Sequence, residues 1–253
     1  DEQLSFIGRL AATPLYGYDW LIHVGVNSTR VVSPADNGPD ASGARYALRL
    51  RDRPELRVDG TRLIDTGNID ADGLTTYGIE LAGQYKSLYL QSEYETIRID
   101  RRLSALSNPE FSGWYVQASW IPTGETRRYN PLTAGFDGPK IDKPFNLKKR
   151  QWGAWELGAR YSTLDLNWHS GSAGQAPLAD SVRGGEQTIW TLGVNWYLNP
   201  IACIMVQYQD VHIDRLSPGG TAFGAGALTP PAGRQIGQKY QTTAVRTQIA
   251  RSE

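Results

Sequence analysis

Apolar and polar residues alternate with a period of two along most of this 253-residue chain. Successive side chains of a β-strand point to opposite faces, so the pattern predicts strands with one apolar and one polar face. In residues 154–165, for example, Trp155 and Leu157 alternate with Glu156 and Arg160. Nine segments, most of them about 9–12 residues long, show the pattern, at residues 4–12, 19–33, 75–85, 88–97, 114–120, 154–165, 187–198, 203–211 and 240–249.

The length of these segments and of their connections predicts the fold class. Strands of globular proteins usually have about 5–6 residues, whereas a tilted strand that crosses a membrane has about 9–11. Short links such as residues 86–87 and 199–200 alternate with long ones, and aromatic residues gather at strand ends. These features predict an all-β, antiparallel transmembrane outer-membrane β-barrel whose short turns face the periplasm. A soluble β-barrel or sandwich is the alternative.

The two faces of the expected strands give a prediction of orientation, because a slip of one residue would invert every side chain. Facing lipid or a neighbouring subunit we expect Trp114, Val116, Trp155, Leu157, Trp190, Leu192 and Val194. Facing the lumen we expect Gln117, Glu156, Arg160, Gln187 and Thr191.

Composition and motifs argue against other classes of protein. Lys plus Arg and Asp plus Glu both number 26, so the net charge of zero does not favour a nucleic-acid partner. The single cysteine, Cys203, excludes a disulfide framework, and the three histidines have no metal-ligand spacing. No nucleophile, phosphate-binding or dinucleotide motif is present, and the start DEQLSFIGRL has no signal-peptide pattern. We therefore expect no enzyme activity, no cofactor and no metal site.

One basic segment lies in the long link of residues 34–74. In RYALRLRDRPELR, Arg49, Arg51 and Arg53 are spaced so that an extended backbone projects them from one side, with Arg57 continuing the row after Pro54. Guanidinium groups stay charged and bind phosphate through two parallel donors, so such a row forms a ladder for anions. The alternative is an edge strand protected by charge. Strand parity further predicts that residues 35–74 include a segment folded against the inner wall, in which RYALRLRDRPE is a loop or a short inner strand.

A second basic segment, PKIDKPFNLKKR, lies in the link of residues 121–152, which is long although it falls on the short-turn side. It carries Lys140 and Lys143, and Lys148, Lys149 and Arg150 follow them. We expect a lysine cluster that folds into the lumen and raises the local concentration of anions. The alternative is a solvated periplasmic turn.

Four stretches resemble the porin O/P family, the phosphate-selective porins of Gram-negative outer membranes. They are RLRDRPELR with RLIDTGNI, SGWYVQASWIPTGETRRYNP, GAWELGARYSTLDLN and GGEQTIWTLGVNWYLNP, in the order of the family. The resemblance implies a homotrimer of barrels with about 16 strands each, wide enough for an aqueous channel. It also implies an arginine ladder at Arg49, Arg51, Arg53 and Arg57 and an inward periplasmic turn that holds Lys140 and Lys143.

Together these observations predict a passive anion-selective porin with phosphate or polyphosphate as the leading solute. Residues 1–253 would form a single β-barrel domain that supplies about 9–10 strands, the C-terminal portion of a longer barrel. The expected partners are outer-membrane lipid, small anions such as phosphate, and further copies of the chain in a homotrimer. The alternatives are a structural or plugged barrel and a general-diffusion porin without anion preference.

Overall fold

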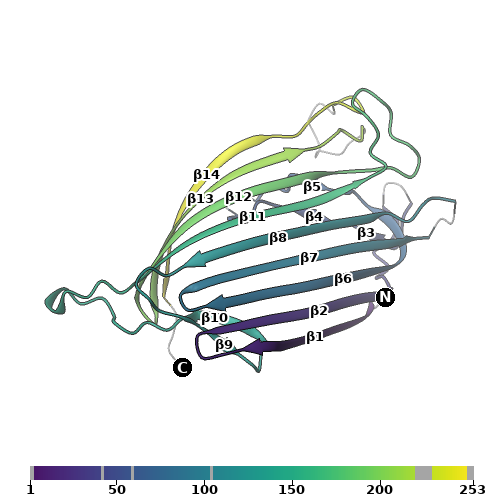
Figure 1. Ribbon diagram of the computed structural model, residues 1–253. Helices are drawn as coiled ribbons and strands as arrows, with labels where there is room; N and C mark the ends of the chain where they lie inside the picture. Colours follow the sequence, from purple (N-terminus) through teal and green to yellow (C-terminus); the bar gives the residue numbers. More distant parts are fainter. Residues whose placement is uncertain (1–2, 41–42, 58–59, 103–104, 220–229, 250–253) are drawn as a thin grey trace.

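The computed structural model describes residues 3–40, 43–57, 60–102, 105–219 and 230–249. One antiparallel sheet dominates it, in which nine long strands pair in chain order (Figure 1). These strands are β1 (Leu4–Tyr16), β2 (Trp20–Ser33), β6 (Ile69–Tyr85), β7 (Leu88–Arg101), β8 (Glu110–Trp120), β11 (Ala154–Trp168), β12 (Val182–Asn199), β13 (Ala202–Asp214) and β14 (Lys239–Ile249). Each contains most or all of one predicted segment, so the all-β antiparallel class is confirmed.

The sheet has two ends, β1 and β14, and within the described ranges these strands do not pair with each other. The expected closure into a barrel is therefore not found in this part of the protein. The one helical element among the described residues is the 3-10 helix η1 (Leu147–Lys149). No helix in the part of the chain that the structure describes is long and apolar enough to cross a membrane.

The turns at one end of the sheet are tight. β6 and β7 are joined by two residues, Lys86 and Ser87, and Lys86 has a positive φ of 52°. Two-residue hairpins favour turns with positive φ because their twist matches that of the strands. At the opposite end the connections are long, as the sequence predicts.

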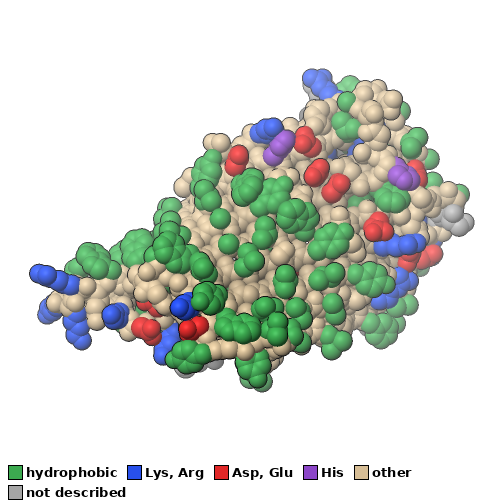
Figure 2. Space-filling view, in the orientation of Figure 1, with side chains coloured by type: hydrophobic (Ala, Val, Ile, Leu, Met, Phe, Trp, Pro, Cys, Tyr) green, Lys and Arg blue, Asp and Glu red, His purple; other side chains and the backbone are tan. Residues whose placement is uncertain are grey.

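The two faces of the sheet differ as the alternation predicts. Leu157, Trp190 and Leu192 are 43%, 55% and 54% exposed, whereas Glu156 and Gln187 on the opposite face are 1% and 3% exposed. The inner face carries the loop between β2 and β6. The outer face carries many apolar side chains (Figure 2). The predicted orientation is confirmed at these positions.

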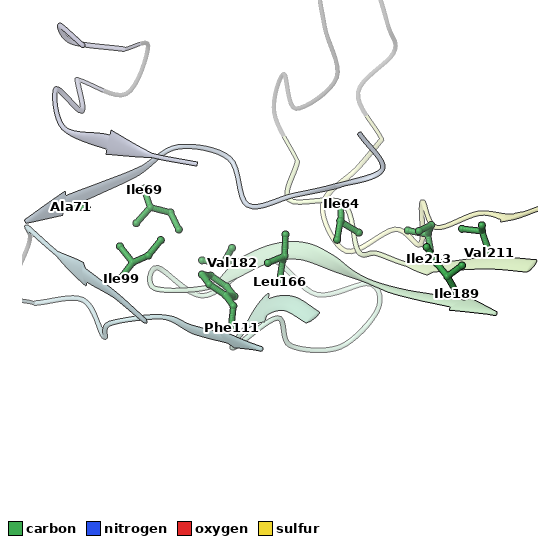
Figure 3. Close-up of a cluster of buried hydrophobic side chains, with 10 residues drawn as sticks. All are labelled: Ile64, Ile69, Ala71, Ile99, Phe111, Leu166, Val182, Ile189, Val211 and Ile213. Carbon is green, nitrogen blue, oxygen red and sulfur yellow. The ribbon is translucent and has the colours of Figure 1, made fainter. Parts of the chain in front are cut away.

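The loop between β2 and β6 folds against the inner face. It contains three short strands, of which β3 (Ala47–Leu48) pairs with β6, while β4 (Arg51–Asp52) pairs with β5 (Ile64–Asp65). Leu48 and Leu50 pack against a buried apolar cluster formed by Ile64, Ile69, Ala71, Ile99, Phe111, Leu166, Val182, Ile189, Val211 and Ile213 (Figure 3). The predicted inward segment within residues 35–74 is confirmed, and β6, which begins at Ile69, takes up the last residues of this range.

One glycine permits the close approach of this loop to the wall. Gly185 of β12 has a φ of +95°, and a Cβ atom there would lie 3.0 Å from Cγ2 of Ile64. A larger residue would therefore strain the backbone and push β5 away from the sheet. Because burial of an isoleucine side chain contributes about 1.5–3 kcal/mol, Ile64 is a strong anchor for the loop.

A second element reaches the inner face from the link between β8 and β11. It is the hairpin of β9 (Arg127–Asn130) and β10 (Gly135–Pro139). The Tyr129 hydroxyl lies 2.9 Å from Nδ1 of the buried His23, and the Phe136 ring packs edge-on against Tyr89 at 5.0 Å. The chain then leaves the sheet in a projection that carries η1 (Figure 1).

Candidate anion pathway

The first arginine of the predicted ladder, Arg49, is held by an acid. Its Nε and Nη2 atoms donate to the two carboxylate oxygens of Asp65 at 2.7 and 2.5 Å. Partial burial raises the pKa of the Asp65 carboxyl, but hydrogen bonds from Arg49 and the Gly67 N–H outweigh this and leave the pKa below its ordinary value. The pair is therefore charged at neutral pH, and the charge of Arg49 is largely neutralised.

Arg51 and Arg53 lie near Arg62 rather than in a row with Arg49. Arg62 was not part of the ladder predicted from the sequence. Arg51 is exposed, Arg53 and Arg62 are half-buried, and none of them forms an ion pair with a described residue. Partial loss of water contact, and then the positive charges of Arg51 and Arg53, lower the pKa of Arg62. Three guanidinium groups thus concentrate positive charge on one part of the inward loop; we call them the arginine cluster.

Arg57 does not continue the row, which corrects the sequence prediction. Its backbone N–H donates to the Pro54 carbonyl at 2.9 Å, and its φ of 51° is in the left-handed region. The chain turns at this point, because Pro54 lacks an N–H and favours a turn. Arg57 instead lines a separate cavity of about 340 Å³ with Tyr240 and Thr242 of β14.

Glu55 fastens the tip of the loop to the wall of the sheet. Its Oε1 atom accepts hydrogen bonds of 2.8 Å from Arg160 Nε and from Ser162 Oγ of β11. Its Oε2 atom lies 3.4 Å from Thr191 Oγ1 of β12 and from Gln209 Nε2 of β13. One carboxylate therefore joins the loop tip to three adjacent strands. It also compensates the charge of Arg160.

Between the loop tip and the β9–β10 hairpin lies a polar cavity of about 270 Å³. Two ion pairs contribute to its lining: Arg160 with Glu55, and Arg127 of β9 with Glu156 of β11. Glu156 also accepts hydrogen bonds from Asn195 Nδ2 at 3.0 Å and from the Tyr197 hydroxyl at 2.7 Å. The inner face is thus rich in polar groups, but its cations at this level are paired with acids.

The lysine-rich link divides into two parts, and this corrects the expected inward cluster. The β9–β10 hairpin folds onto the inner face, but Lys148 and Lys149 belong to η1 in the projection that leaves the sheet (Figure 1). Lys140 follows β10, and its Nζ lies 3.9 Å from Oδ1 of Asp142. Lys140 and Lys143 are both exposed. The chain leaves the inner face after this point, and the Phe145 ring packs on Trp196 near the end of β12.

Arg62, Glu55 and Asp65 are the residues of this region that sequence reasoning missed. Glu55 stands inside the basic run itself, and Arg62 and Asp65 flank the apolar pair Leu63 and Ile64. The sequence did contain a signal for them. Two apolar residues between two charged ones, in an otherwise polar loop, indicate a segment that packs against the core, and its charged neighbours are then held in fixed positions.

The sheet has an apolar outer face, a polar inner face and short turns at one end, which is the organisation of an outer-membrane β-protein. The family model for the phosphate-selective porins O and P matches residues 6–218. The chain belongs to this family, and membership places it in the outer membrane of Gram-negative bacteria.

Two relatives and one solved structure are similar to this chain. Porin O of Pseudomonas aeruginosa is 27% identical over 241 residues, which are 90% of this chain and 52% of that protein. An uncharacterized protein of Caulobacter vibrioides is 30% identical over 155 residues, 61% of this chain and 27% of that protein. The structure of OmpT of Vibrio cholerae, an outer membrane protein in its trimer form, covers 96% of this chain and 56% of that chain at 14% identity and a TM-score of 0.40. The chain thus spans about half the length of porin O.

The Arg49–Asp65 pair gives a prediction about charge. Asp65→Asn keeps an acceptor for the Gly67 N–H but removes the charge that neutralises Arg49, so anion preference should rise. Two unit charges 4 Å apart in water interact with about 1 kcal/mol, so the anion-to-cation permeability ratio should rise by at most about fivefold at low salt. Reversal potentials in a potassium chloride gradient measure this ratio. An unchanged or lower anion preference in Asp65→Asn would contradict the prediction.

The same pair predicts a pH dependence in the native protein. Protonation of Asp65 also frees the charge of Arg49, so anion preference should rise only as the pH falls through the lowered pKa of Asp65.

Proposed function

We propose that the protein is a passive, anion-selective porin for which phosphate is the leading solute. In this proposal the chain forms one β-barrel domain together with further strands that close the sheet between β1 and β14. Anions enter from the long-loop side, pass the inward loop and leave past Lys140 and Lys143 on the periplasmic side.

The observation that carries the proposal is the arginine cluster. Arg51, Arg53 and Arg62 have no acid partner among the described residues and lie on a loop that the apolar cluster and Glu55 hold on the inner face. Guanidinium groups present two parallel donors to a phosphate oxygen pair, and a group of several weak sites lets an anion be released as well as bound. The porins O and P are a phosphate-selective family, which supports phosphate over other anions.

The test is to remove the cluster's charges together. In the variant Arg51→Gln, Arg53→Gln, Arg62→Gln, the anion-to-cation permeability ratio should fall by about tenfold at low salt, because three uncompensated charges are lost. The difference should shrink near 1 M salt, where the Debye length is about 3 Å. The measurement is the reversal potential of single channels in chloride and phosphate gradients.

A matched control removes three cations that lie off the inner face. Arg98 points outward between Ile97 and the buried Ile99, and Lys148 and Lys149 lie in the projection. Replacing these three by glutamine should leave the permeability ratio unchanged. If the control and the cluster variant lower the ratio equally, net charge rather than the cluster sets selectivity. If the native protein does not conduct, the barrel is plugged and the proposal is wrong.

A second candidate is a general-diffusion porin without anion preference. One observation favours it: besides Arg49, the inner-face cations Arg9, Arg127 and Arg160 are each paired with a carboxylate. A wall of compensated charges passes small solutes of either sign. For this candidate, the native protein should give reversal potentials near zero in a potassium chloride gradient.

The proposed assembly is a homotrimer in outer-membrane lipid, as the family resemblance implies. Large hydrophobic side chains such as Leu10, Tyr77 and Ile79 are more than half exposed on the sheet. An apolar face of this extent is covered by lipid or by another subunit. Chemical cross-linking of the membrane-embedded protein tests the trimer, which a monomeric product alone would exclude.

A further inference from the structure

The projection between β10 and β11 has no part in the proposed passage. We define the rim projection as residues 144–152; it includes η1 and leaves the end of the sheet that has the short turns (Figure 1). Its base is tied to that end by a hydrogen bond of 2.6 Å from the Phe145 N–H to the Leu198 carbonyl, close to the turn between β12 and β13. The rim projection therefore belongs to the periplasmic end assigned from the turns.

Aromatic side chains place the base of the rim projection on the outer side of the sheet. The Trp155 and Trp196 rings stack at 5.1 Å, and Trp155 shares the outer face with Leu157. The Phe145 ring packs edge-on against Trp196 at 5.4 Å, and Trp196 Nε1 donates to the Trp152 carbonyl at 2.7 Å. Phe145 and Trp152 therefore extend an aromatic group that stands at the rim of the apolar face.

The tip of the rim projection is cationic and has an exposed apolar residue. Lys148, Lys149 and Arg150 are exposed, and no ion pair joins them to any residue that the structure describes. Leu147 beside them is 69% exposed and Trp152 is 59% exposed. Cations gather visibly at the end of the projection in Figure 2.

Local hydrogen bonds hold the tip in one shape. The backbones of Asn146 and Gln151 pair through hydrogen bonds of 2.9 and 3.0 Å, and Asn146 Oδ1 accepts from the Lys149 N–H at 3.1 Å. The Arg150 N–H donates to the Leu147 carbonyl at 3.2 Å. The three cations are therefore presented on a closed loop, which loses little freedom when a ligand binds.

We propose that the rim projection binds the phosphate-bearing headgroups of anionic phospholipids in the leaflet at the periplasmic end. Tryptophan rings prefer the boundary between headgroups and acyl chains, and basic side chains beside them are attracted to anionic lipid. Leu147 and Trp152 enter this boundary while Lys148, Lys149 and Arg150 contact the headgroups. A dissolved anion makes no favourable contact with the exposed apolar side chains of Leu147 and Trp152, whereas acyl chains do, and this favours a lipid over free phosphate.

The experiment compares lipid retention in a neutral detergent. The intact protein is titrated with phosphatidylglycerol or phosphatidylcholine, and bound lipids are counted by native mass spectrometry. The variant Lys148→Gln, Lys149→Gln, Arg150→Gln should retain phosphatidylglycerol about tenfold or more less strongly, because each basic group contributes separately. Retention of phosphatidylcholine should not change. The charge-preserving variant Lys148→Arg, Lys149→Arg, Arg150→Lys should retain phosphatidylglycerol like the native protein.

Three outcomes would overturn the proposal. Equal phosphatidylglycerol retention in the native protein and the glutamine variant would show that the tip does not bind lipid. Displacement of phosphatidylglycerol by an equimolar amount of inorganic phosphate would identify a site for the free anion. Loss of higher oligomers in the glutamine variant with unchanged lipid retention would identify a contact between copies of the chain. None of these results depends on whether the channel selects anions.

Discussion

Replacing Glu156 with alanine is expected to lower the free energy of unfolding by about 3–5 kcal/mol, because the variant leaves a buried charge without its partner. Glu156 is 1% exposed and pairs with Arg127, whose guanidinium also lies 4.9 Å from the centre of the Tyr89 ring. Without the carboxylate, the Arg127 guanidinium has no acid partner among the described residues beside the Tyr89 ring. The β9–β10 hairpin should then detach from the inner face. Denaturant unfolding in micelles, followed by tryptophan fluorescence, measures the loss.

A double variant separates the buried charge from the lost hydrogen bonds. Glu156→Gln retains an acceptor for Asn195 and Tyr197, and Arg127→Met removes the unpaired cation while keeping an apolar side chain on Tyr89. The combination should recover most of the stability, since replacement of a whole buried ion pair is often close to neutral. A Glu156→Ala variant that loses less than about 1 kcal/mol would show instead that water reaches the pair.

Replacing Glu55 with alanine should loosen the tip of the inward loop and increase open-channel current noise several-fold. The carboxylate accepts two hydrogen bonds of 2.8 Å, from Arg160 and Ser162, and hydrogen bonds to charged groups contribute about 1.5–3 kcal/mol. The rest of the loop stays docked through Ile64, so the channel itself should persist. Single-channel recordings at fixed voltage measure the noise spectrum.

Glu55→Gln provides the matched control, because it keeps an oxygen acceptor for Arg160 and Ser162 but removes the charge. Its current noise should stay near the native level, while the freed charge of Arg160 should raise anion preference by up to about fivefold. If glutamine and alanine increase the noise equally, the tip is held by charge alone. If neither changes the noise, Glu55 does not hold the tip.

The strands and their faces were determined locally by the sequence. Alternation in β11 and β12 is a property of neighbouring residues, so it predicted that Trp190 faces outward and that Glu156 faces the opposite, inner side. That Glu156 is buried there was decided by the β9–β10 hairpin, which covers it. The inward loop followed from strand parity, because β2 and β6 are neighbours in the sheet and the long link between them must lie on one side. Strand ends were less well predicted, since tertiary contacts at Ile69 and Val182 extend β6 and β12 beyond their alternating cores.

Only the tertiary structure determined which arginines of the inward loop are paired with an acid and which are not. Arg49, Arg51 and Arg53 have the same spacing in the sequence, yet the pairing of β4 with β5 brings Asp65 to Arg49 and leaves the other two without an acid among the described residues. The same fold brings Arg62 close to them. An ion pair depends on which backbones meet, and alternation carries no information about that.

The direction of the lysine-rich link was decided in the same way. Its composition does not distinguish Lys140 from Lys149. The β9–β10 hairpin docks on the inner face through Phe136 and Tyr89, and packing of Phe145 on Trp196 then takes the chain to the outer rim. A period of two fixes side-chain direction within a strand because each residue rotates the next by half a turn. Where a loop goes is fixed by contacts between residues far apart in the chain, and for this protein only the tertiary structure supplies them.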